Sequence, residues 1–171
     1  MNEFVNWHNE ITAKKVVKAL MNNGFSATYC RTAEEAVAAI LDQVPEGASV
    51  GIGGSWTVGE LGLLDELDAR GHRILNHGRV GLSKEEKNEI RRQQLTCDVF
   101  LSGTNAVTME GELVNMDGTG NRVAAMIYGP GKVIIVAGVN KIVKDLSAAM
   151  VRIKTIAAPI NNKRLGLPNP C

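Results

Sequence analysis

The chain has 171 residues, a length typical of a single domain. Its 44% apolar and 22% charged residues exclude a disordered chain and predict a real hydrophobic core. Nineteen basic and eighteen acidic residues leave a net charge of +1, so there is no basic field for nucleic acid or for an acidic membrane surface. We therefore expect no nucleic-acid partner.

The sequence predicts no targeting segment and no membrane span. The first ten residues, MNEFVNWHNE, lack the apolar core of a signal peptide. The longest apolar run, 133–139, is far short of the roughly 20 residues that a membrane span needs, so we expect no membrane partner. The cysteines, Cys30, Cys97 and Cys171, are odd in number and far apart. This spacing fits neither a disulfide framework nor a zinc site, and favours a cytoplasmic location.

The first third of the chain alternates helical and extended patterns. Apolar residues at helical spacing predict a helix over residues 4–20, and the alternation over 25–29 predicts a short strand. Thr32 and Glu35 then form a capping-box pattern at the start of a helix that ends at the turn 45–47.

The remaining pattern predicts an α/β protein. Four stretches have the pattern of strands: 48–52, 72–76, 98–102 and 132–137. Two more capping boxes precede helices: Thr57 with Glu60, and Ser83 with Glu86. The segment 107–118 predicts a hairpin, and 142–157 a closing helix ended by Pro159. We expect an open, mostly parallel sheet with helices on both faces and an inserted β-hairpin. Residues 1–158 are predicted to form a single domain, and 159–171 an extended tail.

Three loops with an early glycine and short polar side chains follow three of the predicted strands. Ligands of open parallel sheets bind outside the carboxyl ends of the strands, so these loops are candidates for one binding site. Such turns are ordinarily rich in Gly, Asn, Ser and Thr, so a single loop of this kind is weak evidence. The candidate residues are Gly53, Gly54, Ser55, Thr57, Gly103, Thr104, Asn105, Gly138, Asn140 and Lys141.

The stretch GIGGSWTVGELG, residues 51–62, matches no nucleotide-binding or nucleophile motif. A dinucleotide fingerprint would need a glycine at Trp56 and an acidic residue after the strand 72–76. The nucleotide P-loop pattern is absent, and Thr57 occupies the final glycine of a nucleophile elbow. We therefore expect no tight NAD site. The remaining interpretations are a plain turn, or a glycine turn whose following helix N-terminus attracts an anion.

The segment after the hairpin adds a second group of candidates, Gly118, Gly120, Asn121 and Arg122, around the turn DGTGNR. These residues are first of all turn formers. In the functional interpretation, Arg122 binds a carboxylate or phosphate while Asp117 orients it. Glu112 and Asp117 are weak candidates for a catalytic carboxylate. His8, His72 and His77 lie in unrelated places and form no metal or triad constellation. We expect Arg122→Ala and Lys141→Ala to weaken anion binding with little effect on folding.

The segment SGTNAVTMEGELVNMDGTGNRVAAMIYGPGKVIIVAGVNKIVKD, 102–145, resembles the LUD-domain (lactate utilisation) family, and AAPINNKRL at 157–165 strengthens the similarity. The resemblance implies a fold similar to the group of glucosamine-phosphate isomerase, ribose-phosphate isomerase and CoA transferases. Some members of the family work in bacterial L-lactate oxidation to pyruvate beside iron–sulfur subunits. The resemblance therefore allows iron–sulfur partner subunits and a homo-oligomer. Because residues 159–171 contain one cysteine, we expect no cluster, and no other cofactor, within this chain.

Two function hypotheses follow. In the first, the chain holds a small organic acid, or a phosphorylated or CoA-like anion, at the loop edge. In the second, it is a non-catalytic accessory subunit that docks to an iron–sulfur oxidation complex. The set of polar residues in the loops favours the first hypothesis, and the lack of a recognisable catalytic dyad favours the second.

Overall fold

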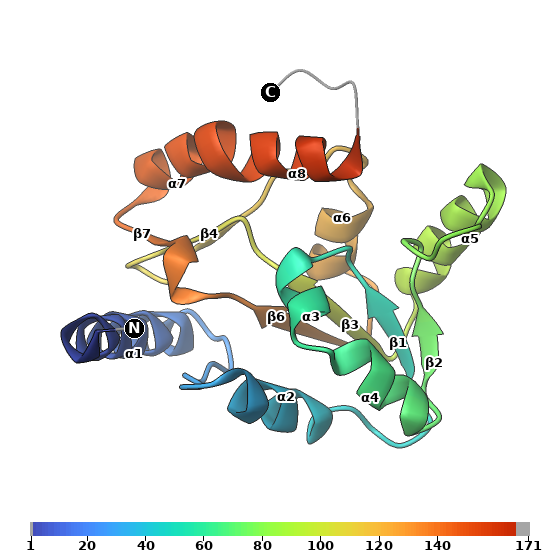
Figure 1. Ribbon diagram of the computed structural model, residues 1–171, viewed down its shortest axis with the longest axis horizontal. Coiled ribbons are helices and arrows are strands. Elements are labelled where there is room, and N and C mark those ends of the chain that lie inside the picture. The colour runs from blue at the N-terminus through green and yellow to red at the C-terminus, as the bar shows by residue number, and fades with distance from the viewer. Residues whose placement is uncertain (1, 167–171) are drawn as a thin grey trace. The chain divides into compact units, whose positions relative to one another are not determined.

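The computed structural model describes residues 2–166 of the chain, which divides into two compact units (Figure 1). The parallel-sheet unit comprises residues 30–103 and 117–136. The hairpin unit comprises 2–29, 104–116 and 137–166 of the described chain. The assignment of residues 1–158 to a single domain stays a prediction. None of the helices within residues 2–166 is both long and apolar enough to cross a membrane.

A four-stranded sheet with the order β2-β1-β3-β6 forms the centre of the parallel-sheet unit, and every neighbouring pair in it is parallel. The strands are β1 (Ser49–Ile52), β2 (Arg73–Leu75), β3 (Val99–Gly103) and β6 (Lys132–Val136). Each lies where the sequence predicts a strand, which confirms the mostly parallel α/β fold.

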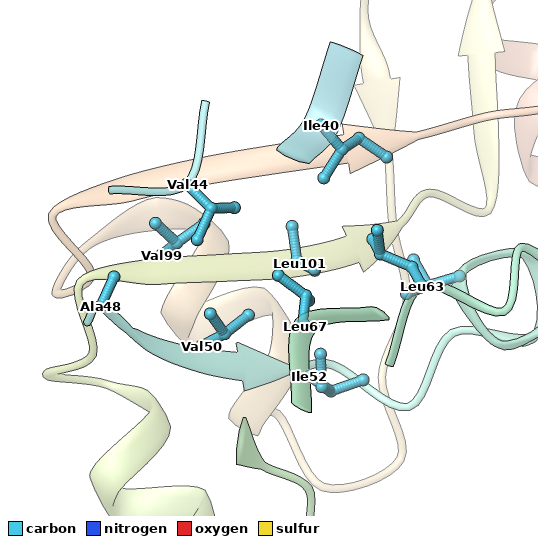
Figure 2. Packing of buried hydrophobic residues seen from close by; sticks show 10 residues of the cluster. Ile40, Val44, Ala48, Val50, Ile52, Leu63, Leu67, Val99 and Leu101 are labelled. Atoms are coloured by element: carbon cyan, nitrogen blue, oxygen red, sulfur yellow. The ribbon is translucent and has the colours of Figure 1, made fainter. Parts of the chain in front are cut away.

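Helices cover both faces of this sheet. They are α2 (Ala33–Leu41), α3 (Trp56–Glu60), α4 (Leu63–Ala69), α5 (Lys84–Gln94) and α6 (Asn121–Ile127). Alternate residues of β1 and β3 pack with α2, α3 and α4 in one buried cluster, as Figure 2 shows for most of its members. Phe100 points to the opposite face, where it packs in a second cluster with residues of α5 and α6. This division follows from the two-residue period of a strand.

The strand order places a topological switch point between β1 and β3. From β1 the chain continues to β2 on one side, and from β3 it continues to β6 on the other side. The helices that follow β1 and β3 accordingly belong to opposite faces, α4 to one cluster and α6 to the other. In open α/β sheets the crevice at such a point is where ligands bind.

The hairpin unit contains a three-stranded sheet with the order β5-β4-β7. Its elements are α1 (Glu3–Asn22), β4 (Ala106–Thr108), β5 (Leu113–Val114), the 3-10 turn η1 (Val139–Lys141), β7 (Ile142–Val143), α7 (Leu146–Arg152), the π-helical turn η2 (Ile153–Ala157) and α8 (Ala158–Leu165). β4 and β5 are antiparallel, so the predicted hairpin is confirmed. The Asn23 side-chain amide donates to the carbonyls of Glu110 and Gly111 at 2.8 and 3.1 Å, which ties the hairpin turn to the end of α1.

Two predictions for the first half of the chain are wrong. Residues 25–29 alternate as a strand would but pair with no other strand in the described chain, so the extended backbone stays outside both sheets. The helix predicted to follow the capping box of Thr57 is two short helices, and Ser55, not Thr57, caps the first. Gly62 adopts a φ of +64° between them, a left-handed conformation that interrupts a helix.

The end of the described chain also differs from the prediction. Residues 142–143 form β7, and Asp145 caps the helix that follows, so the closing helix begins later than its apolar spacing indicates. Pro159 does not end it, because helix α8 continues over Ala158–Leu165. The π-helical turn before α8 widens the backbone, and Pro159 lies in the first turn of α8, where its missing N–H costs little. The extended tail is therefore wrong for 159–165, which are helical, and 167–171 lie outside the described residues.

Candidate ligand-binding site at the carboxyl edge of the parallel sheet

Two consecutive glycines continue β1 at the switch point. The Gly53 N–H donates to the Leu101 carbonyl at 2.9 Å, which extends the pairing with β3 by one residue. A Cβ at Gly53 would lie 2.8 Å from Ser102 Oγ and 3.2 Å from Arg122 Cγ, so only glycine fits. Gly54 has a φ of +71° and turns the chain toward α3. These glycines are therefore required by close packing and by the turn.

Arg122 lies beside this turn and is held by Asp117. Its Nε donates to Asp117 Oδ1 at 2.8 Å, its Nη2 lies 2.7 Å from the same oxygen, and its Nη1 donates to the Gly103 carbonyl at 3.1 Å. The other oxygen of Asp117 accepts the Val123 N–H at 2.9 Å and so caps α6. The two side chains are only 13% and 12% exposed. Arg122 and Asp117 thus form a nearly buried ion pair, and the binding of an anion by Arg122 stays a prediction.

His77, which the sequence analysis set aside, lies beside Gly54 of the same turn. A Cβ at Gly54 would be 3.7 Å from His77 Nε2. The ring nitrogen Nδ1 lies beside the side-chain amide of Gln94, which is 1% exposed. Burial lowers the pKa of His77, the nearby cations Arg91 and Lys87 lower it further, and the hydrogen bond to Gln94 opposes them. The burial of Gln94 could have been predicted from the sequence. Gln94 lies four residues after Ile90, which packs in the core, so the two residues share one face of the helix.

The helix dipole contributes less than the sequence suggests. α3 is five residues long, and the Ser55 hydroxyl already accepts the Val58 N–H at 3.3 Å. Thr57 lies inside this short helix and not at its start. An anion at the turn therefore has to be held mainly by side chains.

The parallel-sheet unit thus brings together part of the predicted set. Gly53, Gly103, Asp117 and Arg122 meet through the packing and hydrogen bonds given above. Gly54 and Ser55 continue the same turn. The rest of the segment, Gly118, Gly120 and Asn121, leads from Asp117 into α6, and Gly120, with a φ of +86°, is the residue before its first turn.

The other candidates belong to the hairpin unit. The side-chain amide oxygen of Asn105 accepts the Met116 N–H at 2.8 Å, and the backbone N–H of Asn105 donates to the side-chain oxygen of Asn115 at 3.2 Å. The Thr104 hydroxyl donates to the Ala106 carbonyl at 3.1 Å. Both residues therefore hold the base of the hairpin together.

Three further candidates lie in the loop after β6, and one in the hairpin turn. Gly138 precedes η1, where the Asn140 amide oxygen would lie 2.7 Å from a Cβ on Gly138. Lys141 is the last residue of η1. The Glu112 carboxylate accepts the buried Thr108 hydroxyl at 2.7 Å and so stabilises the hairpin turn. The roles of Lys141 in anion binding and of Glu112 in catalysis stay predictions.

A sequence model of the LUD domain matches residues 13–171. The chain belongs to the LUD-domain family. The match covers the described parts of both units after residue 13, including the turn at Gly53 and the segment with Arg122. This family is associated with lactate utilisation proteins. No curated protein and no solved structure matches the chain.

The chemistry available at this edge of the LUD domain is mainly hydrogen bonding. Arg122 is balanced by Asp117, and His77 is a ring whose pKa is lowered by burial. Burial raises the pKa of the nearby Cys97 thiol, the reverse of what a nucleophilic cysteine requires. Within residues 2–166, no group of three His, Cys, Asp or Glu side chains is arranged as a metal site.

Proposed function

We propose that this LUD-domain chain binds a small organic anion, such as a carboxylic acid or a phosphorylated or CoA-like compound, at the switch point of its parallel sheet. The observation that carries the proposal is the position of Arg122. Its side chain packs against Gly53 after β1 and donates to the carbonyl of Gly103 at the end of β3. These are the two strands between which the strand order reverses.

Asp117 supports this role because it fixes the guanidinium. An arginine held by a carboxylate on one edge is pre-organised, so little side-chain freedom is lost when the guanidinium meets a ligand. The absence of a side chain at Gly53 and Gly54 allows a ligand to approach the backbone of the turn. The family supports an organic acid within this class, since LUD domains are associated with lactate utilisation.

The experiment is a thermal-shift screen followed by calorimetric titration. The panel contains lactate, pyruvate, sugar phosphates, CoA esters and folates, because a ligand bound by the native state alone raises its melting temperature. Arg122→Lys keeps the charge but loses the planar fork, and should weaken the best ligand about tenfold. Arg70→Lys is the matched control: Arg70 pairs with Glu66 at 2.9 Å but precedes β2, at the amino edge of the sheet. A panel without any stabilising member, or equal affinities of the two variants, would contradict the proposal.

The second candidate is the docking subunit, and one observation favours it. Helix α1 exposes Phe4, Trp7 and Ile11, which are spaced three and four residues apart and so share one face. Exposed aromatic residues on one face are typical of protein interfaces. The partner in this hypothesis is an iron–sulfur subunit. Trp7→Ser should abolish that association without changing the affinity for any ligand of the panel, which co-purification and titration would measure.

A further inference from the structure

Gln94 bridges the ends of two strands from a fully buried position. It is the last residue of α5, and its side-chain nitrogen lies 2.9 Å from the Ile52 carbonyl and 2.7 Å from the Leu75 carbonyl. These carbonyls end β1 and β2. Because carbonyl oxygens only accept, the amide nitrogen and not the amide oxygen must face them. Both hydrogens of the nitrogen are then used.

This arrangement determines which nitrogen of His77 carries the proton. Nδ1 lies 3.2 Å from the Gln94 amide oxygen and 3.0 Å from the amide nitrogen. The nitrogen has no hydrogen left to donate, so the oxygen is the partner and it must accept from Nδ1–H. In the neutral ring the lone pair therefore lies on Nε2.

The ring is held neutral by its surroundings. Burial is the main cause of the lowered pKa, and the charged groups that act on the ring are Arg91 and Lys87, both on α5 and both cationic. An imidazole with an ordinary pKa of about 6.5 is already mostly neutral at pH 7.5, and a lower pKa makes it more so. Nε2 is then an acceptor, and it lies at the Gly54 side of the turn whose Gly53 side meets Arg122.

We propose that Nε2 of His77 accepts a hydrogen bond from a neutral donor of the ligand, a hydroxyl group, while the anionic group of the same ligand lies toward Arg122, and that Gln94 is the positioning residue for this ring. The inference rests on the proposed function. It narrows the ligand to a small organic anion that also carries a hydroxyl. A second anionic group at this position would face a lone pair and is disfavoured.

The first test needs no ligand. Nitrogen-15 NMR of the histidine rings, assigned with His77→Gln, should show His77 in the Nδ1–H form at pH 7.5. Gln94→Leu removes the acceptor and should abolish that preference. Should this variant fail to fold, the wild-type spectrum alone decides. The Nε2–H form in the wild type would overturn the inference and leave the proposed function standing.

The second test uses two pairs of probes that differ by hydroxyl groups: glycolate with acetate, and glycerol 3-phosphate with propyl phosphate. The hydroxylated member of the preferred pair should bind at least tenfold more tightly, and the pair that shows this distinguishes a carboxylate from a phosphate ligand. His77→Phe should remove the preference, and His77→Gln, whose amide oxygen can replace Nε2 as acceptor, should partly restore it. His8→Phe, at the exposed histidine of α1, is the control and should change nothing.

The outcomes separate the two proposals. Equal affinities within a pair that binds would overturn the role of His77 while the anion site remains. Binding of neither pair, together with an unresponsive ligand panel, would overturn the proposed function and the inference with it.

Discussion

Gly53→Ala should destabilise the parallel-sheet unit, although it adds only one methyl group. The new Cβ would lie 2.8 Å from Ser102 Oγ and 3.0 Å from Phe100 Cζ. Both residues are 0% exposed, so neither side chain can swing away into solvent. Overpacking of this kind costs about 1–3 kcal/mol. Alanine also restricts the backbone of the unfolded chain, which stabilises the folded state by about 0.4–1 kcal/mol. The net destabilisation is therefore about 1–2 kcal/mol.

Gly59→Ala is the matched control for this substitution. Gly59 is the second-last residue of α3, and a Cβ there would meet nothing within 4 Å. Alanine in a helix is favoured over glycine by about 0.5–1 kcal/mol. Since 1 kcal/mol shifts the melting temperature of a chain of this size by about 2–4 °C, Gly53→Ala should melt below the wild type and Gly59→Ala above it. Thermal unfolding followed by circular dichroism measures both. Wild-type stability of Gly53→Ala would refute the close packing at the turn.

Two further predictions concern Arg122 and His77. Arg122→Ala leaves the nearly buried Asp117 carboxylate without its partner, so it should lower the unfolding free energy by about 2–3 kcal/mol. The double variant with Asp117→Ala should lose about 1–2 kcal/mol less than the sum of the two single losses, which urea unfolding measures. Strict additivity would contradict the pairing. His77 has a lowered pKa in the folded state, so the unfolded chain binds more protons below about pH 6.5 and the stability should fall as the pH drops through that value. His77→Gln should lose less stability over the same window, and identical pH profiles would count against the burial of the ring.

The prediction for Arg122→Ala corrects an expectation from the sequence. Arg122 was predicted to contribute to binding with little effect on folding, as a solvated surface arginine would. The structure instead pairs it with Asp117 and packs it against Gly53. Its removal therefore affects the fold, which is why Arg122→Lys and not Arg122→Ala is used to test binding.

Local signals in the sequence predicted the fold well where each element carries its own start and stop. Ser83 and Glu86 form the full reciprocal capping box that their spacing predicts, and α5 begins there. Thr32 accepts the Glu35 N–H as predicted, but Glu35 reaches back to the N–H of Arg31 and not to that of Thr32. Such contacts lie within a few residues of each other, so the pattern alone specifies them.

The failures occur where the conformation depends on partners distant in the chain. Residues 25–29 have the alternation of a strand, but alternation does not supply a neighbouring strand. Gln94 ends a helix made almost entirely of charged and polar residues, which is typical of a solvated surface. It is buried because two strands end with carbonyls at that place. The spacing from Ile90 indicates that Gln94 faces the core, but it does not indicate which carbonyls Gln94 meets, and so the place of His77 was not predicted.

The same contacts determine how this edge of the sheet can recognise a ligand. Arg122 is balanced by Asp117, and the His77 ring is uncharged near neutral pH, so these groups themselves sum to about zero charge. Arg91 and Lys87 of α5 add a positive field at the ring, which salt screens, and α3 is too short to add much. Recognition then depends on directional groups: the fixed guanidinium of Arg122, the backbone of the Gly53–Gly54 turn, and the Nε2 lone pair of His77, whose direction Gln94 sets. Recognition by hydrogen bonds discriminates by the loss of a partner, because a ligand that lacks the matching group leaves a desolvated donor or acceptor unpaired. A site of this kind selects its ligand by shape and donor pattern more than by charge.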